Sequence, residues 1–199
     1  YGTGFSMNVG AIYKFTDNFR AGVAYESPTW YNLNDELSQR LIVRTTDGTT
    51  DYQDVVNPNV VNIYETYKIQ TPSKWTFSGA YIFGKKGLIS VDYATKDYSN
   101  IKFKPTNDGF FSDLNSQMSS QFKNAYELRI GGEYKIKQWS LRGGYRFEES
   151  PYKVDFVMGD LTGYSTGIGY NFGESRLDVA YANDHRNYNQ SLISSGMND

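Results

Sequence analysis

Few residues in this 199-residue chain could perform nucleophilic or acid–base chemistry, since it has one histidine and no cysteine. His185 lies in the stretch Asn-Asp-His-Arg, beside Asp184 and six residues before Ser191. An esterase would need a serine in contact with a histidine that an acid or amide supports. Closeness in sequence does not supply that geometry, and we expect the segment to be a loop. We therefore predict no catalytic residue, and the sequence shows no phosphate loop, metal-ligand spacing or cofactor motif.

The charged side chains instead form a regular pattern, which is clearest in "YELRIGGEYKIKQWSLRGGYRFEESP", residues 126–151. Apolar and charged residues alternate there, and a period of two indicates a strand with two different faces. Two such runs joined by Lys137-Gln138 indicate a hairpin. The charged face carries Glu127, Arg129, Glu133, Lys135, Arg142, Arg146 and Glu148.

The same alternation recurs along the chain and predicts an all-β antiparallel fold. Only a short turn of helix is expected, over Asp113–Gln121. The eight expected strands are Phe5–Phe15, Phe19–Glu26, Lys74–Phe83, Leu88–Tyr98, the two strands of the hairpin, Gly163–Phe172 and Arg176–Ala182.

Short and long connections alternate strictly between these strands. Tight turns are expected at 16–18, 84–87, 137–138 and 173–175, with long links at 27–72, 99–121 and 149–161 and an open tail from about Asn183. In an up-and-down meander, every second connection lies at the same end of the sheet. Short turns at one end and long loops at the other are typical of outer-membrane β-barrels.

Aromatic residues lie near both ends of the apolar face, as the two membrane interfaces favour. A soluble sandwich with aromatic core layers is the alternative, but glycines on the apolar face (Gly79, Gly132 and Gly143) would fill such a core poorly. A cationic residue facing lipid near the midplane costs roughly 2–4 kcal/mol. The charged face should therefore line an aqueous lumen, and the apolar face should meet outer-membrane lipid.

The totals exclude other classes of protein. No apolar run approaches the roughly 20 residues of a membrane-spanning helix. A net charge of −2 and the lack of a Lys/Arg cluster give no surface for nucleic acid.

The topology places both ends of the chain on the long-loop side, where bacterial barrels do not usually keep them. We therefore expect further strands at both ends. Residues 1–199 would then be a single but partial barrel domain that lacks the early strands and the closing C-terminal strand.

Residues 122–152, "FKNAYELRIGGEYKIKQWSLRGGYRFEESPY", resemble the FadL family of outer-membrane transporters for long-chain fatty acids and other hydrophobic compounds. The shared features are Ala125-Tyr126, Gly131, Trp139, Arg142-Gly143 and Glu149-Ser150-Pro151. The stretches 5–28, 70–83 and 164–182 are similar to other hairpins of the family, in the same order.

The resemblance implies a barrel of about 14 strands with an N-terminal hatch, of which this chain would cover strands six to thirteen. It also implies passive uptake: loops capture the substrate, a lumenal pocket accepts it, and a kinked early strand releases it sideways. In the family a basic residue ahead of the strand near Phe122 meets an acid head group. Here Met118 lies at about that place, which leaves room for a neutral hydrophobic substrate.

Two groups of residues are candidates for ligand binding. Phe110, Phe111, Leu114 and Met118 are apolar residues in a loop that should face water. The alternative is that this loop folds on its own apolar side chains. Arg129, Arg142 and Arg146 should line the lumen, either binding a ligand head group or joining a cross-strand ion network.

The leading hypothesis is a transport protein in the outer membrane of a Gram-negative bacterium that binds a hydrophobic small molecule. The first alternative is a structural or secretion-accessory barrel whose external loops dock a partner protein. The second is the esterase built on His185.

Overall fold

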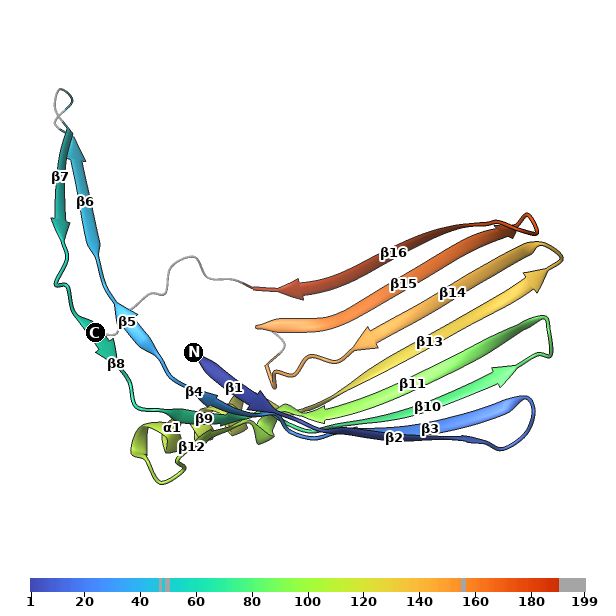
Figure 1. The fold of residues 1–199 in the computed structure, drawn as a ribbon, viewed down its shortest axis with the longest axis horizontal. Helices are drawn as coiled ribbons and strands as arrows, with labels where there is room; N and C mark the ends of the chain where they lie inside the picture. The colour runs from blue at the N-terminus through green and yellow to red at the C-terminus, as the bar shows by residue number, and fades with distance from the viewer. Residues whose placement is uncertain (47, 49–50, 155–156, 190–199) are drawn as a thin grey trace.

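The computed structural model describes residues 1–46, 48, 51–154 and 157–189. Eight strands form one antiparallel sheet, in the order β16-β15-β14-β13-β11-β10-β3-β2 (Figure 1). They are β2 (Asn8–Lys14), β3 (Phe19–Glu26), β10 (Lys74–Ile82), β11 (Gly87–Asp97), β13 (Asn124–Ile136), β14 (Trp139–Glu148), β15 (Met158–Asn171) and β16 (Arg176–Tyr188). Each strand pairs with the main-sheet strand that precedes it in the chain and with the one that follows it, which confirms the up-and-down meander.

The predicted sorting of the connections is confirmed as well. The tight turns gather at one end of the sheet and the long connections at the other (Figure 1). Lys137 has a φ of 55° and Gly173 a φ of 101°, which is the left-handed backbone that short hairpin turns require.

Pairing register places the charged and apolar residues on opposite faces, as predicted. We call the charged side the lumen face and the apolar side the lipid face. On the lipid face Trp75 is 45% exposed, Ile89 43% and Leu177 60%. Within the described residues the buried apolar side chains are only Ala94 and Ala125, so the sheet has no apolar core of its own. This excludes the soluble sandwich, which would bury these rings and aliphatic side chains.

The long link 27–72 contains strands that the sequence did not reveal. β4 (Trp30–Leu33) and β9 (Tyr67–Gln70) pair within a second sheet, in the order β1-β4-β9-β12, with β1 (Gly2–Phe5) and β12 (Lys102–Lys104) at its edges. Beyond it, β5 (Glu36–Ser38) pairs with β8 (Val61–Ile63), and β6 (Leu41–Thr46) pairs with β7 (Asp51–Val56). These four strands form a ribbon that extends away from the main sheet (Figure 1).

The predicted boundaries of three strands were wrong by several residues. The first strand is not continuous from Phe5 to Phe15, because β1 belongs to the second sheet and β2 to the main one. At the break the Ser27 hydroxyl accepts the Met7 N–H at 2.9 Å. The last strand does not end at Ala182 but continues to Tyr188, where backbone pairing with β15 persists. The seventh begins at Met158 instead of Gly163.

The described helices are the short 3₁₀ turn η1 (Tyr98–Asn100) and α1 (Gly109–Gln121). Neither has the length and apolarity that crossing a membrane requires. α1 begins four residues earlier than predicted, because Asp108 caps it: the Asp108 carboxylate accepts the Phe111 N–H at 3.2 Å.

Candidate functional site

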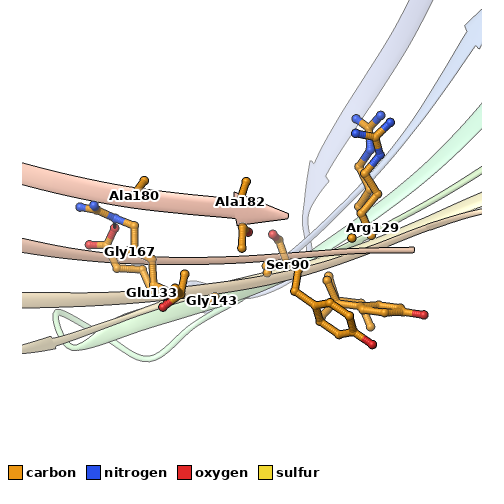
Figure 2. Close-up of a pocket in the computed structure, with 18 of the residues that line it drawn as sticks. Ser90, Arg129, Glu133, Gly143, Gly167, Ala180 and Ala182 are labelled. Carbon is orange, nitrogen blue, oxygen red and sulfur yellow. Dashed lines mark hydrogen bonds and ion pairs between the residues drawn. The ribbon is translucent and has the colours of Figure 1, made fainter. Parts of the chain in front are cut away.

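A concavity of about 610 Å³ occupies the lumen face of β11 and β13–β16. A row of small residues, one from each strand, runs across it at matched register. The row consists of Ser90, Gly131, Gly144, Ser165 and Ala182. Because none of these side chains projects far, the concavity is bounded mainly by the longer charged residues on either side (Figure 2).

The border nearer the tight turns is an ion-pair cluster centred on Arg142. Its guanidinium donates to the Glu133 carboxylate at 2.7 Å and to the Asp178 carboxylate at 2.6 Å. Asp178 lies on β16, two strands away from Arg142 on β14. The contact passes over β15, whose lumen-facing residues there are Gly167 and Gly169.

The border nearer the long loops repeats this arrangement. Arg146 contacts Glu148 at 2.5 Å and Asp184 at 3.7 Å, and Arg186 donates to Glu148 at 2.9 Å. The Arg146–Asp184 and Arg186–Glu148 pairs again join β14 to β16 across β15, here beside Gly163. The ion pairs thus link β13, β14 and β16, and the paired charges flank the small-residue row on both sides.

The structure brings the three predicted arginines to one surface, since Arg129, Arg142 and Arg146 all line the concavity. Arg142 and Arg146 are each held by two carboxylates, as the ion-network interpretation expects. Arg129 pairs with Glu127 of its own strand and lies apart from the Glu133 cluster (Figure 2).

A second, more polar pocket of about 350 Å³ lies where the lumen face meets the long loops. We call it the mouth pocket. Lys74 lies 3.8 Å from Glu26 and 4.0 Å from Glu127, and Lys96 lies over the Tyr98 ring, 5.1 Å from its centroid. Glu149, Pro151, Met158 and Arg186 also line the mouth pocket.

Tyr98 lies in η1, outside the spanning strands, and burial raises the pKa of its hydroxyl, with Glu148 and Glu127 raising it further. The folded-state pKa therefore exceeds the unfolded value of about 10. The stability that neutral Tyr98 contributes is fully present below that pH and is lost as the pH rises through the raised pKa. We expect Tyr98→Phe to retain more stability in urea at about pH 11 than the parent does, and to match it near pH 8.

The exposed Tyr64→Phe serves as the control, and tyrosinate absorbance provides the titration. Ionisation of Tyr98 earlier than most of the 18 tyrosines would contradict the prediction.

The apolar loop residues divide into a packed set and an exposed one. Phe111 stacks on Phe103 at 6.1 Å between ring centroids and contacts Tyr67 at 5.8 Å. The Asn115 side chain fixes Phe103 further, by bonds of 2.7 and 2.9 Å to its backbone N–H and carbonyl.

Leu114 and Met118 are half-buried at helical spacing from Phe111, so they share the packed face of α1. Phe110 is 68% exposed and is the member of the predicted set that a ligand can reach from solvent.

Sequence reasoning missed Asp178, Asp184 and Arg186 as members of the lumen face. Their even numbers continue the alternation that begins at Arg176, so the signal was present past Ala182. Asp184 and Arg186 fall in the segment expected to be a loop, whereas Asp178 lies within the expected strand Arg176–Ala182, on the face opposite Leu177 and Val179.

His185 faces the opposite side of β16 from Asp184, because adjacent residues of a strand alternate between its faces. This separates the two members of the proposed esterase group. Ser191 lies outside the described residues.

An antiparallel sheet with an apolar outer band, a charged inner face and long loops at one end defines the wall of an outer-membrane β-barrel. The comparisons with known proteins agree. A family model described as "Outer membrane protein transport protein (OMPP1/FadL/TodX)" matches residues 1–192. The chain belongs to this family of outer-membrane transport proteins, and its location is the outer membrane of a Gram-negative bacterium.

Two curated relatives are similar at low identity. The "Long-chain fatty acid transport protein" of Escherichia coli O6:H1 is 25% identical over 92% of this chain and 42% of its own length. The "47 kDa outer membrane protein" of Pasteurella multocida is 21% identical over 90% of this chain and 43% of its own length. The chain therefore spans less than half the length of the relatives it matches.

Among solved structures, the "CymD monoaromatic hydrocarbon channel" has a TM-score of 0.52 at 16% identity. The match covers 90% of this chain and 46% of that one, and it supports the barrel fold.

Proposed function

We propose that the chain forms part of the wall and mouth of a barrel for passive uptake of small hydrophobic molecules across the outer membrane. Loops capture the substrate, the lumenal concavity accepts it, and it leaves sideways into the bilayer. The observation that carries this proposal is the small-residue row between two neutralised ion-pair borders. It gives an apolar molecule an uncharged surface along the lumen, and the charged side chains of the two borders are paired with one another.

The relatives' names support the chemical class of the substrate. One relative is a long-chain fatty acid transport protein, and the channel with the matching fold is one for monoaromatic hydrocarbons. We include both long-chain acids and neutral hydrocarbons in the proposal.

We further propose that other strands complete the barrel, giving about 14, together with an N-terminal hatch. Support comes from the sheet edges: within the described residues, β2 and β16 each pair on one side only. Unpaired backbone groups in hydrocarbon cost several kcal/mol each, so both edges need partners in the membrane.

The test of the transport proposal is uptake of radiolabelled long-chain acid and of labelled toluene by cells that lack the protein, with and without the gene restored. Restored uptake of at least one compound is expected. Unchanged uptake of both would reject the proposal.

Phe110 allows a sharper test of capture by the loops. We expect Phe110→Ser to reduce uptake several-fold at low substrate concentration and little at saturation. It removes an exposed apolar side chain and its 5.7 Å ring contact with Phe111, but it leaves the stack of Phe111 on Phe103 in place. Phe111→Ser should instead loosen the helix, since it breaks the stack on Phe103, and should lower thermal stability. Equal uptake by Phe110→Ser and the parent at every concentration would exclude capture at this residue.

The ribbon β5–β8 supports a second candidate function, docking of a partner protein through the external loops. Leu41, Val56, Val61 and Ile63 are each more than half exposed on it. Recovery of one stoichiometric partner with the intact protein, lost on replacing these four residues by serine, would favour docking over transport if uptake is also absent.

A further inference from the structure

Ser150, at the outer end of β14, is completely buried, with 0% of its surface exposed. Its hydroxyl donates to the Met158 carbonyl at 2.5 Å, and its N–H donates to the Asp160 carboxylate at 2.7 Å. The hydroxyl also accepts the Tyr152 N–H at 3.3 Å. These bonds tie the start of the β14–β15 connection to its end. We call residues 149–153 together with Met158 the Ser150 cluster.

The Ser150 cluster is hydrogen-bonded to the C-terminal end of α1. The Lys123 N–H donates to the Pro151 carbonyl at 2.9 Å, and the Lys153 N–H donates to the Gln121 carbonyl at 2.8 Å. The Lys153 ammonium donates to the Ser119 carbonyl at 2.8 Å, where a cation is favoured by the helix dipole. The Phe122 and Tyr152 rings also pack together, 4.8 Å apart.

The Ser150 cluster also lines the mouth pocket, through Glu149, Pro151 and Met158. The helix that carries Phe110 and the entrance to the lumen therefore share one support. A shift of the Ser150 cluster would move both the helix and the entrance. Its hydrogen bonds reach the last turn of α1, and its side chains line the pocket.

Ser27 offers a natural comparison, since it also precedes a proline at the outer end of a strand. It is 6% exposed, and its hydroxyl accepts the Met7 N–H at 2.9 Å and donates to the Pro28 carbonyl at 2.9 Å. Its bonds stay within the β1–β4 region, and it lines neither α1 nor the mouth pocket.

We propose that Ser150 is a positioning residue that couples the capture helix α1 to the mouth pocket, so that a substrate held at Phe110 is delivered to a fixed lumenal entrance. The proposal rests on the proposed transport function. The coupling itself is a structural property that can be measured without any substrate.

The test uses spin labels on cysteines introduced at the exposed residues Ser112 of α1 and Val154 of the connection, in the membrane-inserted protein. The chain has no native cysteine, so these labels are unique within it. We expect one narrow distance distribution in the parent and in Ser27→Ala. Ser150→Ala should broaden it, since the released population should rise about tenfold.

Asp160 provides a matched pair of variants. Asp160→Asn keeps an oxygen that accepts the Ser150 N–H and should keep the narrow distribution, whereas Asp160→Ala should broaden it. Heat-modifiable migration in gels confirms that each barrel is folded. A narrow distribution in Ser150→Ala would overturn the proposal.

Uptake gives the functional arm. Ser150→Ala should raise the half-saturating substrate concentration about tenfold while the maximal rate changes little. An unchanged half-saturating concentration in a variant with broadened distances would also overturn the coupling. Failure of the parent to transport either compound would overturn the transport function, and the distance measurement would then decide the Ser150 proposal alone.

Discussion

Replacing Val91 with arginine is expected to destabilise the membrane-inserted protein by about 2–4 kcal/mol, the cost of a cation on the lipid face near the bilayer midplane. Val91 lies in the middle of β11, and its side chain is 39% exposed on the lipid face. Replacing its neighbour Ser90 should cost far less, because Ser90 faces the polar lumen beside Gly131. Urea unfolding in lipid vesicles measures both variants.

The two substitutions place the same cationic side chain on neighbouring residues of β11, so the added charge is matched, although valine and serine differ in volume and strand propensity. The comparison therefore reports chiefly which face meets lipid. Equal destabilisation by both variants would contradict the assignment of the faces. A larger cost at Ser90 would reverse that assignment.

The membrane-spanning strands could be predicted because two independent physical requirements leave a trace in the sequence. Lipid on one face and water on the other impose a period of two, and the hairpins impose turn residues at 16–18 and 84–87. A one-residue slip of β13 would have turned Glu127 and Arg129 into lipid, so the register could be predicted as well.

The ribbon could not be predicted, because it has no lipid-facing side that would require every second residue to be apolar. Leu41 and Ile42 are consecutive apolar residues, and β6 and β7 are exposed throughout, so the alternation that marks the other strands is missing. Its strands exist through local pairing across a long hairpin, which leaves only a weak signal.

The site could be predicted in part. Arg142 and Arg146 were assigned to the lumen from their own strand, but their partners Asp178 and Asp184 lie on β16, and only the pairing register brings them close. Likewise, Ser150 is buried because the β14–β15 connection brings Met158 and Asp160 into contact with it. No local sequence pattern predicts that contact. Contacts that cross two strands or close a loop are therefore what the structure adds.

The largest functional effect is expected from Ser165→Trp, which should lower substrate uptake at least about tenfold. Ser165 is the β15 member of the small-residue row and lies between Gly144 and Ala182. An indole there would cover the floor of the concavity between the ion-pair borders at Arg142 and Arg146, so a substrate would lose the small-residue row as a path. Initial rates of labelled acid or hydrocarbon uptake provide the measurement.

Thr166→Trp is the matched control, because Thr166 is the next residue of β15 and faces lipid, where an indole is tolerated. Both variants should insert and show similar melting temperatures, so a difference in uptake reports the face of the wall and not its stability. Normal uptake by Ser165→Trp would mean that substrate does not pass along this part of the lumen. Loss of uptake by Thr166→Trp, with normal uptake by Ser165→Trp, would place the substrate path on the lipid face. Only the indole at residue 166 would then obstruct the substrate.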